Sequence, residues 1–419
     1  MSLIDIAMLG RLGAGAMAAA GYTQQFHFLS SSVLFAVGFA CVALMSRALG
    51  AHDLERARHA LAASLLICLA AAVVIVLAVL LPARTWLQLL GAEPAVVQKT
   101  IPYLTLVLGS TLPLAIAMTL EFGLRANKDT RTPLLIAVAV SAVKALGNLL
   151  LIFGWWGLPR LELVGAGLAT LASQGVGLVI FAAIVWRQPR SSPLALRLRD
   201  FRPSLPLARD VVRLSLPGLG ERLAMNLALL AYFRILAEYG TAAIAAYTVG
   251  IRVLSFSWLP GSGIGVAAST LVGQALGSGD PDSATRVGWR SLRLAVAVAL
   301  VLGIPCALAR APLARLFVED AATVAALEPF LLCLALAQPF LQAHFALGGA
   351  HRGAGDTMTP FFAAAAGNWA LRLPLACLFA FVWQLDLVWV WYALLFDHLT
   401  RTAWLAGSFR RGRWRQARA

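Results

Sequence analysis

The chain has 419 residues, of which 60% are hydrophobic and 13% charged, and its mean hydropathy is +0.80. A soluble domain is about half apolar and about a quarter charged, so this composition excludes an ordinary water-soluble protein. The net charge of +15 would suit nucleic-acid binding. However, the basic residues are spread over several short segments without an aromatic stacking surface, so we expect no nucleic-acid partner.

The first stretch, MSLIDIAMLGRLG, is apolar up to Arg11 and too short to cross a bilayer. It lacks the positive start, long apolar centre and small-residue cleavage site of a signal peptide. We interpret it as the end of a first transmembrane helix that is truncated at the N-terminus. A short amphipathic lead-in is the alternative.

Apolar runs long enough to cross about 30 Å of hydrocarbon follow along the whole chain. Eleven spans are predicted, at 16–47, 60–82, 101–123, 134–154, 164–186, 214–237, 243–273, 289–309, 322–350, 361–383 and 386–409. Lys and Arg total 23 in one set of alternating loops and 6 in the other. The positive-inside rule places the first set in the cytoplasm. The sequence therefore predicts an all-α polytopic membrane protein.

One polar phrase occurs twice between apolar runs, as NKDTRTP and as GAGDTMTP. The spacing in sequence between Asp129 and Asp356 is the same as that between Pro133 and Pro360. The same offset aligns RALGAHDLERA with QALGSGDPDSA without a gap. A constant offset over this length indicates a tandem duplication.

Each half of the duplication holds six helices, so both halves enter the membrane in the same direction. We predict two six-helix lobes in tandem, related by an axis along the membrane normal, with the first helix incomplete. The predicted parts are an N-terminal lobe at 1–186, a cytoplasmic interlobe linker at 187–213, a C-terminal lobe at 214–409 and a basic cytoplasmic tail at 410–419.

The repeated phrase follows one predicted helix and precedes another. Thr132 suits an N-cap and Pro133 the first helical position, and the second copy has the same arrangement. We therefore predict a cytoplasmic hinge at Asp129, Pro133, Asp356 and Pro360. Two roles for the aspartates stay open: capping alone, or ion pairs across the inner mouth that open when the lobes part.

Polar side chains inside spans are costly in a bilayer, so those present are candidate functional residues. Gln24, His27 and Ser31 are spaced i, i+3 and i+7 and share one helix face. They either line a wet cavity or bond to neighbouring helices. Glu221, in the predicted span 214–237, is a candidate proton or cation carrier of the second lobe.

Enzymatic motifs are missing from the sequence. No lysine follows a glycine, which excludes a G-K-[ST] phosphate-binding loop, and neither H-E-x-x-H nor G-x-S-x-G occurs. The histidines lack ligand spacing, and the cysteines form no C-x-x-C pair. We expect no catalytic activity, cofactor or metal site. The segment GSGIG (261–265) is predicted to serve close helix packing or a kink rather than nucleotide binding.

The order of LIDIAMLGRLGAGAMAAAG, RALGAHDLERAR, DTRTP, GLPGLGERL, LVGQALGSGD and RGAGDTMTP resembles the multidrug and toxic compound extrusion (MATE) transporters. The resemblance implies two lobes around a central cavity and a monomeric antiporter of the cell inner membrane. It also implies export of small amphipathic or cationic compounds, driven by entry of H+ or Na+. Related lipid-linked oligosaccharide flippases are the alternative, but few arginines lie deep in the spans, which favours export. The duplication disfavours a passive channel.

In one branch of this family, the first lobe binds its cation through residues of helices 1, 5 and 6. Matched to this sequence, these positions are Asp5, Lys144, Asn148 and Thr170. A lysine about halfway through a span costs about 2.5 to 3.5 kcal/mol unless it is neutral or paired. We hypothesise that Lys144 substitutes for Na+ by pairing with Asp5 until Asp5 takes up a proton. A static bridge between the two helices is the alternative.

Overall fold

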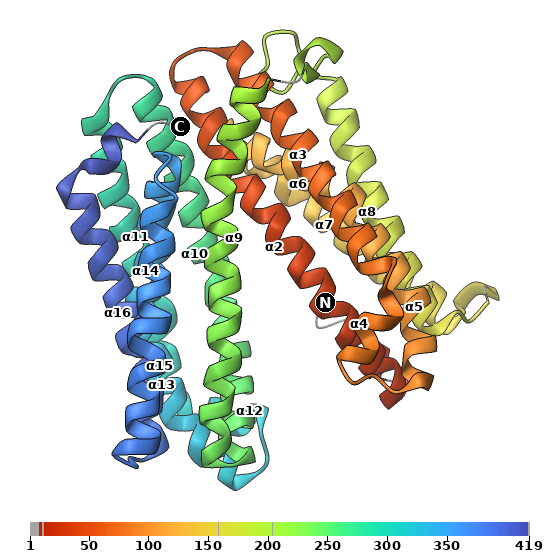
Figure 1. Cartoon of the computed structure of the whole chain (residues 1–419), viewed down its shortest axis with the longest axis vertical. Helices are drawn as coiled ribbons and strands as arrows, with labels where there is room; N and C mark the ends of the chain where they lie inside the picture. The colour runs from red at the N-terminus through yellow and green to blue at the C-terminus, as the bar shows by residue number, and fades with distance from the viewer. Residues whose placement is uncertain (1–7, 11, 158, 203, 418–419) are drawn as a thin grey trace. The chain divides into compact units, whose positions relative to one another are not determined.

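The structure, a computed structural model, describes residues 8–10, 12–157, 159–202 and 204–417. Over these residues the chain is helical nearly throughout and contains no β-strand (Figure 1). Nine of the described helical segments are long and apolar enough to cross a membrane. The prediction of an all-α polytopic membrane protein is confirmed. Most of the predicted partial first helix lies outside the described residues.

The first half of the described chain contains seven α-helices. They are α2 (Ala14–Gly50), α3 (Leu54–Leu80), α4 (Ala83–Leu89), α5 (Pro94–Gly109), α6 (Thr111–Ala126), α7 (Arg131–Phe153) and α8 (Glu162–Trp186). Only Ser110 separates α5 from α6, and the two together form one predicted span. Pro113 explains the break, because it has no N–H to donate to the carbonyl of Gly109.

The second half of the described chain contains eight α-helices. They are α9 (Leu205–Leu236), α10 (Thr241–Gly277), α11 (Pro281–Leu308), α12 (Arg310–Phe317), α13 (Ala321–Gly353), α14 (Met358–Ala365), α15 (Leu373–Cys377) and α16 (Leu387–Arg411). The π-helical segment η4 (Ala366–Arg372) joins α14 to α15, and η5 (Leu378–Val382) continues α15 to the end of the same span. Pro374 accounts for the irregularity, because it cannot donate a hydrogen bond to the preceding turn.

Two predicted spans differ from the observed helices in apolarity or in their bounds. Neither α9 nor α16 is among the nine candidate spans of the described chain, since both carry charged residues along their length. In addition, α9 begins at Leu205 and not at residue 214, so the end of the predicted linker is helical. Pro206 favours this early start, because a proline in the first turn loses no helical hydrogen bond.

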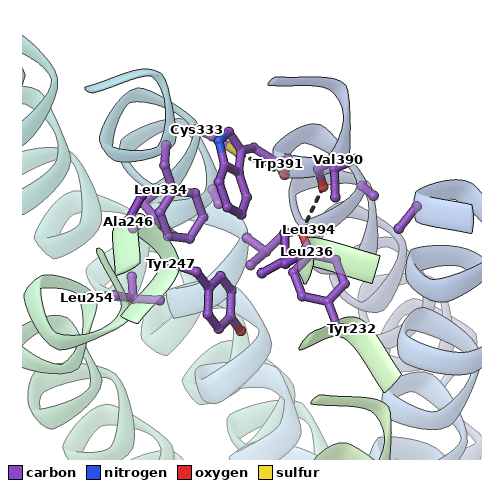
Figure 2. Close-up of a cluster of buried hydrophobic side chains, with 14 of the residues drawn as sticks. Tyr232, Leu236, Ala246, Tyr247, Leu254, Cys333, Leu334, Val390, Trp391 and Leu394 are labelled. Carbon is purple, nitrogen blue, oxygen red and sulfur yellow. Dashed lines mark hydrogen bonds between the residues drawn. The ribbon is translucent and has the colours of Figure 1, made fainter. Parts of the chain in front are cut away.

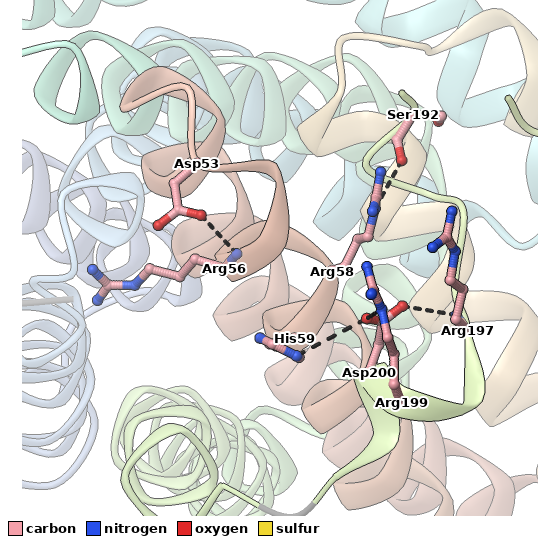
Figure 3. Close-up of polar contacts among 8 residues, drawn as sticks. All are labelled: Asp53, Arg56, Arg58, His59, Ser192, Arg197, Arg199 and Asp200. Atoms are coloured by element: carbon pink, nitrogen blue, oxygen red, sulfur yellow. Dashed lines mark hydrogen bonds and ion pairs between the residues drawn. The ribbon is translucent and has the colours of Figure 1, made fainter. Parts of the chain in front are cut away.

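The segment before α9 is held against α3 (Figure 3). The side chain of Arg58 is buried and its Nε donates to the carbonyl of Ser192 at 3.1 Å. Asp200 is also buried; its Oδ2 accepts the backbone N–H of Arg197 at 2.7 Å, and its Oδ1 lies 4.0 Å from His59 Nε2. The predicted linker is therefore an ordered segment of the fold.

The chain divides into two compact units. Unit 1 comprises residues 1–45 and 53–213, and unit 2 comprises residues 46–52 and 214–419. The core of unit 1 includes Leu104 and Leu108. The core of unit 2 is rich in aromatic residues (Figure 2). There the rings of Phe330 and Trp391 are 4.2 Å apart, and the hydroxyl of Tyr232 donates to the carbonyl of Val390 at 2.8 Å.

Glycines allow α10 to lie close to α13. A Cβ built on Gly265 would lie 2.8 Å from the carbonyl oxygen of Phe345, and one on Gly261 would overlap the side chain of Gln342. The prediction that GSGIG serves close helix packing is confirmed for these two glycines.

The repeated A-L-G turn packs against its own copy inside unit 2. A Cβ on Gly50 would overlap the carbonyl of Gln274, and a Cβ on Gly277 would overlap the carbonyl of Arg47. The offset of the duplication relates Gly50 to Gly277, and it also relates Arg47 to Gln274. The contact is therefore reciprocal: the glycine of each copy packs on the same position of the other copy, as in an interface with two-fold symmetry.

Candidate functional site

Two members of the predicted coupling set of the first half lie next to one helix interface. A Cβ on Gly147 of α7 would lie 3.0 Å from the Cβ of Ala169 of α8, so the two helices are in close contact at this level. Asn148 and Thr170 directly follow these residues, and both are buried. Asp5, the remaining acid of the set, lies outside the described residues.

Lys144 lies one helical turn before Asn148 and is half-buried. Its charge acts electrostatically on His27 of α2. The hydroxyl of Thr170 donates to the carbonyl of Ala166 at 2.9 Å, which leaves its oxygen able to accept. An amide, a hydroxyl and a fixed positive charge are thus contributed by neighbouring parts of α7 and α8.

The three polar residues of α2 have similar surroundings. Gln24, His27 and Ser31 are all half-buried, as expected for one shared helix face. His27 Nδ1 is buried and has no hydrogen-bond partner among the described residues. A role for this face in lining a cavity stays a prediction.

Glu221, the candidate carrier of the second half, is an ion-pair member. Arg352 Nη2 of α13 donates to Glu221 Oε2 of α9 at 2.6 Å, and the side chains are only 14% and 15% exposed, respectively. Glu221 can therefore take up a proton only if it gives up a strong electrostatic partner. Sequence reasoning missed this pair, because Arg352 was assigned to a loop.

A second ion pair lies deeper in unit 2. Arg401 Nη2 donates to Asp397 Oδ2 at 2.7 Å, and both side chains are almost fully buried. Gly367 of η4 lies against this pair, since a Cβ there would overlap Asp397. His344 interacts electrostatically with a member of each pair, Arg401 and Glu221. Hydropathy alone did not indicate this cluster, because its charges lie on three different helices.

The repeated polar phrase caps the helices that follow it. Asp129 Oδ1 accepts the backbone N–H groups of Arg131 at 3.1 Å and Thr132 at 3.0 Å, and Oδ2 accepts the Thr132 hydroxyl at 2.6 Å. The predicted N-cap at Thr132 is therefore wrong: helix α7 begins at Arg131, and Asp129 supplies the capping oxygen. Pro133 is the third helical residue, where its missing N–H is still harmless.

Asp356 acts in the same way in the second half. Its Oδ1 accepts the backbone N–H of Thr359 at 3.0 Å, and Pro360 again lies in the first turn. Among the contacts of the described residues, neither Asp129 nor Asp356 forms a salt bridge. Capping is the role seen here, and ion pairs across an inner mouth stay a prediction.

The environment of Asp129 changes its acidity. Partial burial alone would raise the pKa of this carboxyl group, but the hydrogen bonds from Thr132 and Arg131, with the charge of Arg131, outweigh it and lower the pKa below the ordinary value. Asp129 is therefore ionised at neutral pH and able to cap α7.

Known proteins resemble this chain over nearly its whole length. A protein-family model described as MatE matches residues 1–150 and 217–378. A probable multidrug resistance protein NorM from Bradyrhizobium diazoefficiens is 32% identical over 399 residues, covering 93% of this chain and 84% of that protein. A probable NorM from Thermotoga maritima is 26% identical over 414 residues, covering 98% and 88%, respectively.

Solved structures share the fold. The Vibrio cholerae MATE transporter VcmN in the bent form superposes with a TM-score of 0.87 at 22% sequence identity, covering 98% of this chain and 92% of that one. An outward-facing multidrug resistance MATE family transporter gives a TM-score of 0.89 at 21% identity, covering 98% and 90%.

Proposed function

Because the chain belongs to the MATE family of transporters, we propose that it exports small amphipathic compounds across the cell inner membrane in exchange for H+. The observation that carries export is the family match, which extends over both copies of the duplicated sequence. Nine candidate spans among the described helices support a multi-pass location. Alternating access then exposes the substrate site to each side of the membrane in turn.

Coupling to H+ rather than Na+ is supported by Lys144. This ammonium group is part of α7, one turn from the buried amide of Asn148, at a position where the family resemblance implies a neutral Na+ ligand. A fixed positive charge repels a second cation at short range. A proton avoids this repulsion, because it neutralises the carboxylate that the lysine would otherwise pair with. We propose Asp5 as that carboxylate.

Unit 2 would respond to a proton through Glu221. Protonation would remove its charge and release Arg352, which lies four residues before the capping residue Asp356. Proton uptake and movement of the α13–α14 connection would thus be linked. We propose this pair as a second coupling point and the connections around Pro133 and Pro360 as hinges.

Flipping of lipid-linked oligosaccharides is the second candidate. Its pyrophosphate group would require a basic binding surface, and Arg222, Arg252 and Arg372 lie within the helices of unit 2. The sequence favoured export because few arginines lie deep in the spans. These three arginines make that preference weaker.

Transport by proteoliposomes distinguishes the coupling ions. A panel of amphipathic dyes is followed under an imposed pH gradient and then under an imposed Na+ gradient, each at a fixed membrane potential. We expect transport to follow the pH gradient and to ignore Na+. Na+-stimulated transport at fixed pH would contradict H+ coupling.

Variants test the residues involved. Asp5→Asn and Lys144→Met should abolish pH-driven transport while the protein still folds. Lys99→Met provides a matched control, because Lys99 is an exposed lysine near the start of α5. Normal pH-driven transport by the Asp5→Asn variant would show that the Asp5–Lys144 bridge is static.

A further inference from the structure

The carboxylates inside the helices of unit 2 are already paired with arginine. In its described helices, the acidic residues that lie beyond the first turn are Glu221, Glu328 and Asp397. Their arginine partners lie at 2.6 Å for Glu221, 3.4 Å for Glu328 and 2.7 Å for Asp397. A cationic substrate would therefore find no uncompensated carboxylate in this part of the protein.

Positive charge, in contrast, is in excess there. Arg252 lies on α10, eleven residues after its first residue Thr241, or about 16 Å along the helix axis. Its side chain is exposed and forms no salt bridge within the described part of the chain. Arg372 of η4 has neutral direct contacts: its guanidinium lies 4.0 Å from the ring of Tyr232 and donates to the hydroxyl of Tyr247 at 3.2 Å. The nearby carboxylate of Asp397 also acts on it electrostatically, but Asp397 already pairs with Arg401.

The exposed side of α10 around Arg252 is partly polar. Thr248, Ser255 and Ser262 are spaced i−4, i+3 and i+10 from Arg252, so the four residues share one helix face, and all are exposed. An arginine at this depth is costly against lipid, and such residues usually face a bundle interior or a water-filled cavity. This face of α10 is therefore a candidate for the lining of a water-filled cavity.

Large apolar side chains lie next to Arg252 on the same side. Phe256 and Leu259 follow at i+4 and i+7, and their side chains are 64% and 73% exposed. A guanidinium group beside an aromatic ring and an aliphatic chain matches a molecule with an anionic head and an apolar body.

The duplicated sequence supplies a comparison for this position. The offset of the repeat places Gln25 of α2, which is also exposed, at the position equivalent to Arg252. Both halves thus carry a long polar side chain at the same place in the repeat, and only the second carries a charge. The positive charge is a property of the second half alone.

We propose that Arg252 binds the anionic group of the transported molecule, so that the substrate class is amphipathic anions. This inference rests on the proposed export function, because it names the class of compound exported. Phe256 and Leu259 would contact the apolar part of the molecule. Export of an anion is also favoured by an inside-negative membrane potential, whereas export of a cation opposes it.

Dye binding to the detergent-solubilised full chain tests the charge preference directly. The probes are two xanthene dyes of opposite charge, carboxyfluorescein and the cationic dye pyronin Y, followed by fluorescence polarisation. We expect carboxyfluorescein to bind at least about tenfold more tightly than pyronin Y. Tighter binding of pyronin Y, equal binding of the two dyes, or binding of neither dye would overturn the proposal.

Substitutions locate the effect. Arg252→Gln, which copies the residue found at the equivalent position of the first half, should weaken carboxyfluorescein binding at least about tenfold. Arg252→Lys should retain part of it, and the change in thermal unfolding shows whether the variants fold. Arg234→Gln is the matched control, because Arg234 is an exposed arginine that already pairs with Glu238. Unchanged dye preference in a folded Arg252→Gln variant would overturn the proposal.

Competition identifies the source of the anion. Displacement of carboxyfluorescein by octanoate supports a small organic anion. Displacement by farnesyl pyrophosphate at concentrations at least about tenfold lower supports a lipid pyrophosphate and the flippase alternative. Transport in proteoliposomes is measured separately: anion-selective binding without dye transport would contradict the proposed export but not the binding preference.

Discussion

Two equivalent arginines of the duplicated sequence have acquired different partners. Arg125 of α6 pairs with Glu121 one turn earlier in its own helix, and both side chains are 30% exposed. Arg352, at the equivalent position of the second copy, pairs with Glu221 of another helix and is more deeply buried. Gly348 stands where the second copy would need the equivalent of Glu121. The second copy thus has no local carboxylate at this position, and its arginine forms an ion pair that connects α13 to α9.

The helix caps of the two halves have stayed the same. Asp53 Oδ1 accepts the backbone N–H of Arg56 at 2.9 Å, and Asp280 Oδ1, its equivalent in the second copy, accepts that of Ser283 at 2.8 Å. A cap needs only its own neighbours in sequence, whereas an ion pair between helices depends on the packing of distant segments. Here the local cap is the same in both copies, whereas the ion pair between helices is present in only one.

The largest difference is expected between the two glutamates. Glu221→Gln should lower the free energy of unfolding by about 3 kcal/mol, because it leaves Arg352 without its carboxylate in a site that is mostly buried. Glu121→Gln should lower it by only about 0.5 kcal/mol, since its pair is a partly exposed i, i+4 contact. Denaturant unfolding in lipid-detergent micelles, followed by tryptophan fluorescence, measures both.

A double-mutant cycle with Arg352→Gln isolates the coupling between Glu221 and Arg352. Equal losses for Glu221→Gln and Glu121→Gln would show that the connection between α9 and α13 adds no stability.

The reciprocal glycine contact should give two equal effects of intermediate size. Gly50→Ala and Gly277→Ala should each lower the free energy of unfolding by about 1 to 3 kcal/mol, because the new methyl group overlaps a backbone carbonyl that cannot rotate away. Gly263→Ala is the matched control, since a Cβ there meets no atom within 4 Å and the helix gains propensity. Thermal unfolding of the three variants measures the effects. Tolerance of one substitution but not the other would mean that the contact is not reciprocal.

Removal of a capping carboxylate should have a smaller effect. Asp53→Ala and Asp280→Ala should each lower the free energy of unfolding by about 1 kcal/mol. The two losses should be similar, because each variant removes a capping acceptor from an exposed helix start. Amide hydrogen exchange should accelerate in the first turn of α3 for one variant and of α11 for the other. An effect spread over a whole unit would indicate a structural role beyond capping.

The smallest effect concerns pH and Asp129. Its pKa is lowered in the folded protein, so its contribution to stability is present above the unfolded-state pKa of about 3.9 and is lost as pH falls through the lower folded-state pKa. The difference in Tm between the wild type and Asp129→Asn should stay constant from about pH 8 to pH 5 and shrink below about pH 4. A difference that shrinks near pH 7 would show that another group titrates.

Several features could be predicted from the sequence because they depend on short segments. Apolar runs locate membrane helices whatever their neighbours are, and the constant offset revealed by Asp129 and Asp356 required no structure. The cap was assigned to Thr132 and not to Asp129, because the exact start of a helix varies by one or two residues with local geometry. The start of α9 at Leu205 was missed for a similar reason, since its first turns are too polar to resemble a span.

The sequence by itself determined that this is a helical membrane protein, that it is duplicated, and that the repeated polar phrase precedes a helix in each copy. Those properties follow from hydropathy, from internal similarity and from hydrogen bonds between near neighbours. Only the tertiary structure decided that Arg352 pairs with Glu221, that Asp397 and Arg401 share a buried site with Gly367, and that Arg252 is exposed. Such outcomes depend on which helix faces meet. Every lipid-facing side must be apolar, whichever helices are neighbours, so composition alone does not reveal these contacts.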